Sequence, residues 1–407
     1  MGLDLAFSPG LGAAYLTGNP TLVHVLREAL ARDAAGHRLA LRAARQRAAA
    51  VVQPLPAWRD HYAATEAAPG GRVTIVDEAQ RCRVRAHALA KTRKAAVPLR
   101  DSEPAHLLDA MARRADGPVL IALCGGGQEI HAGEGGLAAW GEALRERPAW
   151  RVVAAPDALA SSDARQRLPA LPGLVADPAL HLAVPHRQLG AARTAAWADR
   201  LLAGDWAGAR LLAGPDPPLL VTRSLAALRE ALRTARGGRT RGLVASSFAR
   251  RLRAEGLSAA LPHQDGDAVA RWFLDAPPDV RGAGALEVAA TEFAVQGLEL
   301  DHVGLCWDLD LIPDGAGWAA RAFRGSTWTR LRDEIAVQDR RNAYRVLLTR
   351  ARRTLVAWVP QGDLRDPTRP PALYDAVADA LLAAGAETLD TVAAPVEDQP
   401  LPAQVLL

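Results

Sequence analysis

The stretch Arg72-Val-Thr-Ile-Val-Asp-Glu-Ala-Gln-Arg81 is the most informative part of the sequence, because an apolar run ends there in two adjacent carboxylates. A plain strand with a polar end is the ordinary interpretation of such a pattern. In a parallel sheet, however, ligands bind outside the carboxyl ends of the strands, so Asp77 and Glu78 are expected to face a cleft. Two acids in that place suit phosphate chemistry, in which Asp77 would hold Mg²⁺ and Glu78 would orient the attacking water.

On both sides of this stretch, short apolar segments alternate with longer helical patterns, which is typical of a parallel α/β architecture. The candidate strands are almost continuously apolar, as expected for strands covered on both faces. Strands are expected over residues 13–17, 72–76, 119–124, 151–155, 219–222, 242–245, 286–290, 302–307 and 354–359. Helices are expected over residues 20–32, 104–114, 136–147, 191–203, 224–235, 333–351 and 371–384.

The length of the chain, 407 residues, predicts two or three domains, since a domain commonly has roughly 100–200 residues. The best linker candidate is Ala213-Gly-Pro-Asp-Pro-Pro218, which is rich in turn-forming residues. It predicts two α/β lobes, residues 1–215 and 216–407.

Composition narrows the class of protein. Hydrophobic residues make up 49% and charged residues 23% of the chain, which allows a sizeable core and excludes global disorder. No apolar run reaches the roughly 18 residues of a membrane-spanning helix, so no membrane partner is expected. The three cysteines are far apart and no secretory signal is present, which predicts reduced thiols and a cytoplasmic location. A net charge of +4 permits nucleic acid as a partner without arguing for it.

A second candidate follows the strand expected at residues 119–124. There the chain runs into three glycines and then Gln128. Glycines let the backbone approach a ligand closely, and a glutamine at a strand end can sense a γ-phosphate or its water. A tight turn explains the same residues equally well. The position of Gln128, one helix after the strand of Asp77, favours the functional interpretation.

The second lobe carries further candidates. For its clustered arginines, a solvated basic helix face is the usual explanation. Apolar residues 346–348 would be buried, however, and would hold Arg350 beside a packed element, as a transition-state arginine requires. The candidates are Gln296, Gly297 and Glu299 in residues 291–301, and Arg345 and Arg350 in residues 342–353.

In order along the chain, these segments resemble the helicase motifs of superfamily 1, and more closely the bacterial Schlafen group 3-like DNA/RNA helicase domain. The resemblance runs from about residue 14 to about residue 382. It implies two RecA-like parallel-sheet lobes, ATP and Mg²⁺ as cofactors, and DNA or RNA as a partner. It implies catalytic roles for Asp77, Glu78, Gln128 and Arg350, with Asp77 as the metal ligand and Arg350 as the arginine finger. It also implies nucleotide-binding roles for Arg187 (in Leu182-Ala-Val-Pro-His-Arg187), Gln296, Gly297, Glu299 and Arg345.

The sequence departs from that family at the phosphate-binding loop. A G-x-x-x-x-G-K-[ST] loop would be expected before Thr17, but the chain contains no Gly-Lys dipeptide. Gly10 and Gly12 are followed by Ala-Ala-Tyr, without the lysine or the hydroxyl that holds Mg²⁺. The first lobe is therefore expected to be incomplete at its N-terminus, through truncation or degeneration, with a gap or an unpaired apolar edge beside the strand of Asp77.

Two functions remain open from the sequence. One is an ATP-dependent DNA/RNA helicase or translocase core that is inactive as it stands, because its phosphate cradle is missing. The alternative is a non-hydrolysing nucleic-acid-binding or regulatory module that retains the fold. Whether the chain is an enzyme depends on that difference.

Overall fold

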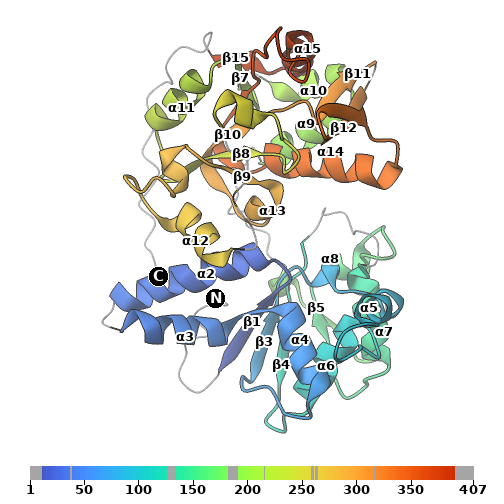
Figure 1. Ribbon diagram of the computed structural model, residues 1–407. Coiled ribbons are helices and arrows are strands. Elements are labelled where there is room, and N and C mark those ends of the chain that lie inside the picture. Colours follow the sequence, from blue (N-terminus) through green and yellow to red (C-terminus); the bar gives the residue numbers. More distant parts are fainter. Residues whose placement is uncertain are drawn as a thin grey trace. The chain divides into compact units, whose positions relative to one another are not determined.

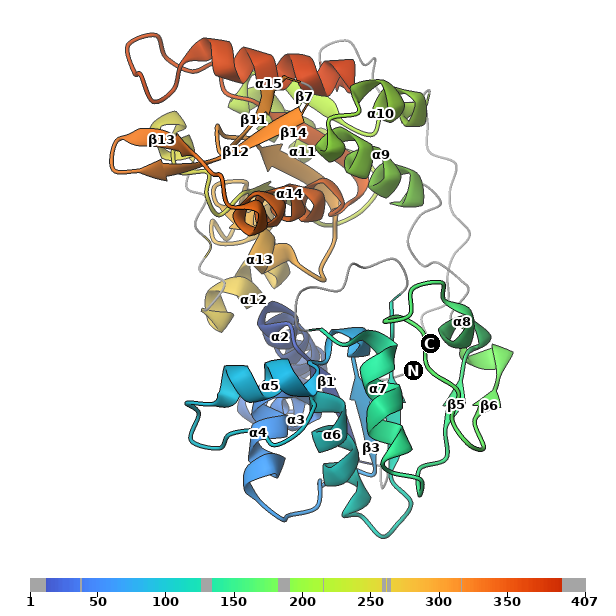
Figure 2. The same cartoon turned by 90° about the vertical axis from the view of Figure 1, so that its right-hand side faces the viewer.

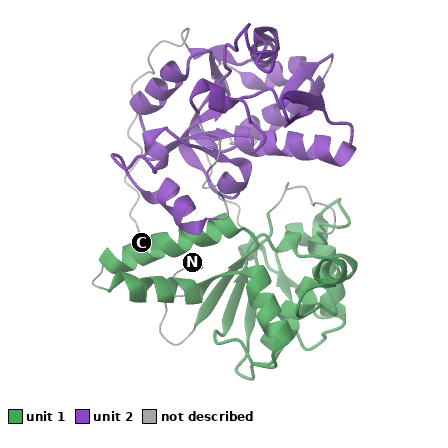
Figure 3. Cartoon of the chain, viewed as in Figure 1, with its two compact units in different colours: residues 1–185 green, residues 186–407 purple. Residues whose placement is uncertain are grey.

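The computed structural model describes residues 12–36, 39–125, 134–181, 191–214, 216–257, 261, 265–315 and 317–389. The chain divides into two compact units, residues 1–185 and residues 186–407 (Figure 3). Each unit contains a parallel sheet with helices packed against it (Figure 1), which confirms the expected α/β fold class.

The division between the units lies upstream of the linker expected at residues 213–218, because helices α9 (Ala191–Ala203) and α10 (Trp206–Ala213) pack in unit 2. The indole Nε1 of Trp197 in α9 donates to the carbonyl of Ala384 at 2.8 Å. The carbonyl of Leu201, also in α9, accepts from Trp318 Nε1 at 2.7 Å. These contacts attach α9 to residues of unit 2 that are far from it in sequence.

Unit 1 is built on a four-stranded parallel sheet in the order β2-β1-β3-β4. The strands expected near residues 13–17, 72–76 and 119–124 are confirmed, whereas β2 was not expected. A separate two-stranded ladder joins β5 to β6. The bounds are β1 Ala13–Thr17, β2 Val52–Pro54, β3 Val73–Val76, β4 Val119–Ala122, β5 Val153–Ala154 and β6 Val175–Ala176.

Helices α4, α6 and α7 lie on one side of this sheet (Figure 2). Trp58 of α4 and Trp140 of α7 belong to the core cluster there. Helix α2 begins after β1 because the Asn19 side chain caps it, accepting from the amide of Leu22 at 3.2 Å. The bounds are α2 Pro20–Gly36, α3 Leu41–Val51, α4 Leu55–Ala64, η1 Ala79–Arg81, α5 Arg85–Thr92, α6 Glu103–Ala112, α7 Gly136–Arg145, α8 Pro156–Ala160 and η2 Pro178–Leu180.

The unpaired apolar edge of unit 1 differs from the expectation. Strand β3, which leads to Asp77, has β1 on one side and β4 on the other, so the described residues leave no gap beside it. The edge lies instead at β4, which pairs only with β3 among the described strands. Val119 on β4 is 41% exposed, so this strand is not covered on both faces as its apolar sequence predicts. The residues near Gly10 lie outside the described part of the chain.

Unit 2 contains a six-stranded parallel sheet in the order β15-β7-β14-β10-β8-β9. The strands expected near residues 219–222, 242–245, 286–290, 302–307 and 354–359 all lie in it. The bounds are β7 Leu220–Thr222, β8 Arg241–Ala245, β9 Ala289–Thr291, β10 Leu300–Cys306, β14 Ala351–Trp358 and β15 Glu387–Thr388.

An antiparallel meander follows β10 and was not expected. Its strand β12 contributes Trp318 to an aromatic cluster, where the Trp307 ring centroid lies 5.2 Å from that of Trp318 and 4.2 Å from that of Tyr344 on α14. No helix in the described ranges has the length and apolar character needed to cross a membrane. The bounds are α11 Leu225–Thr234, η3 Leu252–Glu255, α12 Gly266–Leu274, η4 Ala283–Ala285, α13 Glu292–Val295, β11 Leu311–Asp314, β12 Gly317–Arg324, β13 Thr327–Arg330, α14 Glu334–Leu348 and α15 Pro371–Ala383.

Candidate functional site

Asp77 lies at the carboxyl end of β3, in the place that the sequence predicts. Its amide donates to the carbonyl of Leu16 at 2.8 Å, which ties the end of β3 to β1. Tyr15, on the neighbouring strand β1, lies close enough to Asp77 for the two side chains to interact electrostatically. Burial, and then the negative charge of Asp77, raise the pKa of Tyr15 well above its usual value. Tyr15 therefore stays neutral beside the Asp77 carboxylate.

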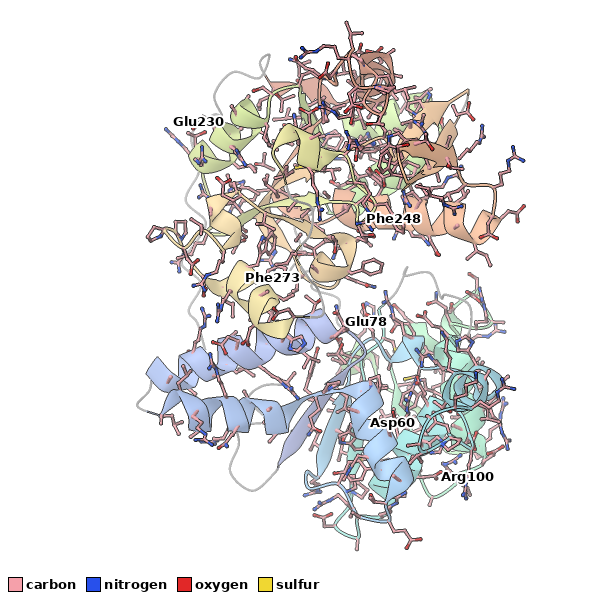
Figure 4. All side chains as sticks on the ribbon, in the orientation of Figure 1. Asp60, Glu78, Arg100, Glu230, Phe248 and Phe273 are labelled. Carbon is pink, nitrogen blue, oxygen red and sulfur yellow. The ribbon has the colours of Figure 1, made fainter. Side chains whose placement is uncertain are left out.

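Glu78, which is labelled in Figure 4, has a strained backbone. Its φ of 47° and ψ of 46° lie in the left-handed region, which is uncommon for a residue other than glycine. The flanking backbone holds it there, because the Ala79 amide donates to the carbonyl of Leu123 at 2.9 Å. The side chain is 25% exposed and forms an ion pair with Arg81, with 3.2 Å between Oε2 and Nε. Strain of this kind is concentrated at functional sites.

The turn after Glu78 is connected to the segment that follows β4. Gln80 is buried, and its Oε1 accepts from the amide of Gly125 at 3.3 Å. Trp140 Nε1 donates to the carbonyl of Ala79 at 2.8 Å and holds the turn from the other side. The structure thus joins the Asp77–Glu78 turn to the start of the glycine segment. Gln128 itself lies outside the described residues, as does Arg187.

In unit 2, the turn before β10 lies beside Arg350. Gly297 has a φ of 76°, so a left-handed glycine reverses the chain after α13. The guanidinium of Arg350 donates from Nη1 to the carbonyl of Leu298 at 3.3 Å and from Nε to the carbonyl of Val346 at 3.0 Å. The Leu300 amide donates to the carbonyl of Arg350 at 3.0 Å. Two of the predicted segments, far apart in sequence, are therefore brought together.

The other predicted residues of unit 2 have identified positions as well. Gln296 caps the C-terminal end of α13, one residue before the turn. Glu299 forms an ion pair with Arg352, with 3.1 Å between Oε2 and Nε. Arg345 binds Asp199 on α9 through two contacts, at 2.5 and 3.1 Å, and so attaches α14 to α9.

The two edges of the unit 2 sheet carry different residues. Leu300 lies opposite Ala351 at the start of β10 and β14, so the turn at residues 296–299 and Arg350 are at the amino ends of these strands. At the carboxyl end of β9, Glu292 accepts from the amide and hydroxyl of Ser247 at 2.8 and 2.7 Å. Burial raises the pKa of Glu292.

A buried polar network lies beyond the carboxyl end of β10. Arg340 Nη1 donates to Asp310 Oδ2 at 2.8 Å, and the Tyr344 hydroxyl donates to Asp310 Oδ1 at 2.7 Å. Both partners of the Asp310–Arg340 ion pair are nearly inaccessible, with 0% and 2% of their side chains exposed. Nearby, Asp308 Oδ1 accepts from the Tyr374 hydroxyl at 2.9 Å.

Sequence reasoning did not single out Tyr15, Asp308 or Asp310. A signal was present for the two acids, which alternate with apolar residues directly after a strand, in Trp307-Asp-Leu-Asp-Leu311. Charged side chains are almost never fully buried unless they are paired, so their position predicts a partner. Tyr15 carries a weaker signal, a hydroxyl within an apolar strand that only the pairing of β1 with β3 brings near Asp77.

The residues present fit Mg²⁺ better than they fit the phosphates of ATP. Mg²⁺ binds through one or two carboxylates together with water and substrate phosphates, and Asp77 supplies such a carboxylate. In the part of the chain that the structure describes, no three His, Cys, Asp or Glu side chains group to hold a metal by themselves. The lysine and the hydroxyl of a phosphate cradle are missing from the sequence.

The model of one protein family, described as Schlafen group 3, DNA/RNA helicase domain, matches residues 5–361. This is the family that the ordered motifs resemble. The match includes the Asp77–Glu78 turn of unit 1 and both the turn before β10 and Arg350 of unit 2. No curated protein matches the chain.

Proposed function

The chain belongs to the Schlafen group 3 DNA/RNA helicase domain family, and we propose that it is a helicase-like core that binds DNA or RNA. One observation carries the proposal: the turn before β10 is hydrogen-bonded to Arg350. The two segments together are a more specific mark of the helicase motifs than either segment alone. Residues that bind one ligand from distant parts of a chain must be brought together in this way.

In this proposal, Asp77 is the carboxylate that holds Mg²⁺ and Glu78 orients a water. The strained backbone of Glu78 supports a functional role, because a cost of about 1–3 kcal/mol persists only where the surroundings enforce it. Arg350 is the cation that faces developing negative charge. Its hydrogen bonds to two main-chain carbonyls support that role, since a fixed guanidinium needs no reorganisation during a reaction.

Hydrolysis of ATP is a separate matter, because these 407 residues contain no Gly-Lys-Ser/Thr. In a P-loop site the glycine-rich backbone cradles the phosphates, a lysine neutralises them and a hydroxyl holds Mg²⁺. Asp77 and Arg350 cannot replace those parts. We therefore propose that the chain by itself binds nucleic acid and turns over ATP slowly or not at all. A cradle supplied by residues outside this sequence would make the same carboxylates catalytic.

The test measures both properties on the 407-residue chain. Fluorescence anisotropy with labelled single-stranded DNA and RNA should show binding that weakens steeply with salt, because phosphate contacts release counterions. Phosphate release from ATP should stay at the level of the Asp77→Ala variant. Absence of binding at low salt would overturn the nucleic-acid proposal. Rapid, Asp77-dependent hydrolysis would overturn the proposal of slow turnover.

A further inference from the structure

We propose that Phe248 is a stacking platform for an unpaired nucleobase, with Arg250 contacting the adjacent phosphate. The inference rests on the proposed function and specifies its ligand as single-stranded nucleic acid. Phe248 follows the carboxyl end of β8, and 41% of its surface is exposed (Figure 4). The chain has only five phenylalanines, and one of them is exposed at the end of a strand.

The inner side of the Phe248 ring is held by a rigid group. The guanidinium carbon of Arg340 lies 3.8 Å from the ring centroid, close enough for a cation–π interaction. Arg340 is itself fixed, because it donates to Asp310 Oδ2 at 2.8 Å and to the carbonyl of Arg321 at 2.9 Å. A ring supported by a buried ion pair keeps its orientation, and such preorganisation lowers the entropy cost of binding a base.

The backbone around Phe248 is equally fixed. Its amide donates to Ser246 Oγ at 3.2 Å, and its carbonyl accepts from the Arg250 amide at 2.8 Å. Ala249 between them is buried, whereas Phe248 and Arg250 are both exposed. Among the described residues, Arg250 has no carboxylate partner. An exposed ring beside an exposed, uncompensated cation is the combination by which proteins hold single strands.

The next strand of the sheet offers a second ring. Phe293 lies in the first turn of α13, which begins directly after β9, the neighbour of β8, and it is 48% exposed. The residues that precede the two phenylalanines are joined, since Ser247 donates to Glu292 through its amide and its hydroxyl. The two rings therefore belong to adjacent strand ends, where successive bases of one strand can stack.

This surface is distinct from the predicted nucleotide residues of the same unit. Phe248 lies at the carboxyl end of the sheet, whereas Arg350 lies at the amino end of β14. The seven residues of β10 separate these edges, a distance of roughly 20 Å at about 3.3 Å per residue. Bases at one edge would therefore not compete with a nucleotide at the other.

The test compares Phe248→Leu with Phe273→Leu, a matched control on helix α12, in the complete chain (Figure 4). Phe248→Leu should weaken binding of a single-stranded oligonucleotide by about 10-fold, since one base stack commonly contributes on that scale. Phe248→Trp should retain the affinity. Arg250→Ala should weaken binding and reduce the slope of log K against log[salt] by about 1. In an oligonucleotide containing 2-aminopurine, the fluorescence quenching on binding should be lost only in Phe248→Leu.

The outcomes separate this inference from the function on which it rests. If the wild-type chain binds no single strand at low salt, the proposed function fails and the inference fails with it. If the wild type binds but Phe248→Leu and Phe273→Leu have equal affinities, only the inference is overturned. Equal losses for duplex and single strand would also overturn it, because a paired base cannot stack on the ring. Should Phe248→Leu not fold, the Phe248→Trp and Arg250→Ala variants carry the same test.

Discussion

The two units use opposite edges of their sheets for the predicted chemistry. In unit 1, Asp77 and Glu78 follow β3 and lie at the carboxyl ends of the strands. In unit 2, Arg350 and the turn before β10 lie at the amino ends. The rule that ligands bind at the carboxyl ends of parallel strands applies to the first set only. In unit 2 that edge instead carries Phe248, an exposed aromatic side chain.

The units also differ in how they hold their candidate residues. Glu78 sits on a strained backbone that the neighbouring strands enforce. Arg350 has an ordinary backbone and is held by hydrogen bonds from its guanidinium to main-chain carbonyls. Strain costs stability and hydrogen bonds contribute it, so relieving the strain at Glu78 and removing a buried polar contact of unit 2 should shift stability in opposite directions.

The largest effect is expected from the buried ion pair of unit 2. Asp310→Ala leaves the guanidinium of Arg340 buried without its carboxylate, which should cost about 3–5 kcal/mol. Urea unfolding, with hydrogen exchange to assign the change to unit 2, measures it. Asp339→Ala, an exposed acid on the same helix as Arg340, is the control. A loss below about 1 kcal/mol would mean that Arg340 finds another partner or water.

The second effect depends on pH and should appear only in unit 2. Burial, and then the charge of Asp310, raise the pKa of Asp308 to about 6. Because this pKa is higher in the folded than in the unfolded state, the stabilising contribution is complete below about pH 4 and is lost as the pH rises through about 6. The loss should be on the order of 3 kcal/mol by pH 7.

Asp308→Asn should remove this part of the pH dependence, since the amide oxygen still accepts from the Tyr374 hydroxyl but does not titrate. The difference between wild type and variant, followed by urea unfolding from pH 4 to pH 7, isolates the group from other titrations. A difference that stays constant over that range would show that Asp308 does not titrate there.

The third effect has the opposite sign and belongs to unit 1. Glu78→Gly should raise stability by about 0.5–1 kcal/mol, because glycine adopts the left-handed backbone without strain, although it costs more unfolded-state entropy. The ion pair with Arg81 is partly exposed and offsets little of this gain. Glu66→Gly, at an exposed position with an ordinary backbone, should destabilise slightly. Equal effects of the two substitutions would show that the strain at Glu78 is not costly.

Most of the sheet framework could be predicted, because short apolar runs such as residues 13–17, alternating with helical patterns, are typical of the strands of a parallel sheet. The order of the strands and the exposed edge at β4 could not be predicted, since an apolar run does not determine which strands will pair with it. The boundary between the units was misplaced for a related reason. Proline and glycine mark a local turn at residues 213–218, whereas the contact of Trp197 with Ala384 joins residues that are far apart in sequence.

The candidate site was predictable where it depends on residue type and strand ends, as for Asp77. Its local geometry was not, because nothing in the sequence requires Glu78 to be left-handed or Tyr15 to lie beside Asp77. The meander of β11 to β13 was missed although Arg324-Gly-Ser-Thr327 is a reasonable turn sequence. Its strands give no alternation of buried and exposed positions, because Trp318, Ala319 and Ala320 of β12 are all buried.

The smallest effect concerns Arg345 and separates two roles for it. Its contact with Asp199 is bidentate but partly exposed, so Arg345→Ala and Asp199→Ala should each cost less than about 1 kcal/mol of stability. If Arg345 only attaches α14 to α9, both variants should leave nucleotide affinity unchanged. If it binds a nucleotide, as the sequence predicts, Arg345→Ala should weaken that affinity, whereas Asp199→Ala, which removes a competing carboxylate from Arg345, should preserve or strengthen it. Calorimetric titration of the wild type and both variants with ATP distinguishes these cases, because a purely structural contact cannot make two partners of one ion pair behave differently.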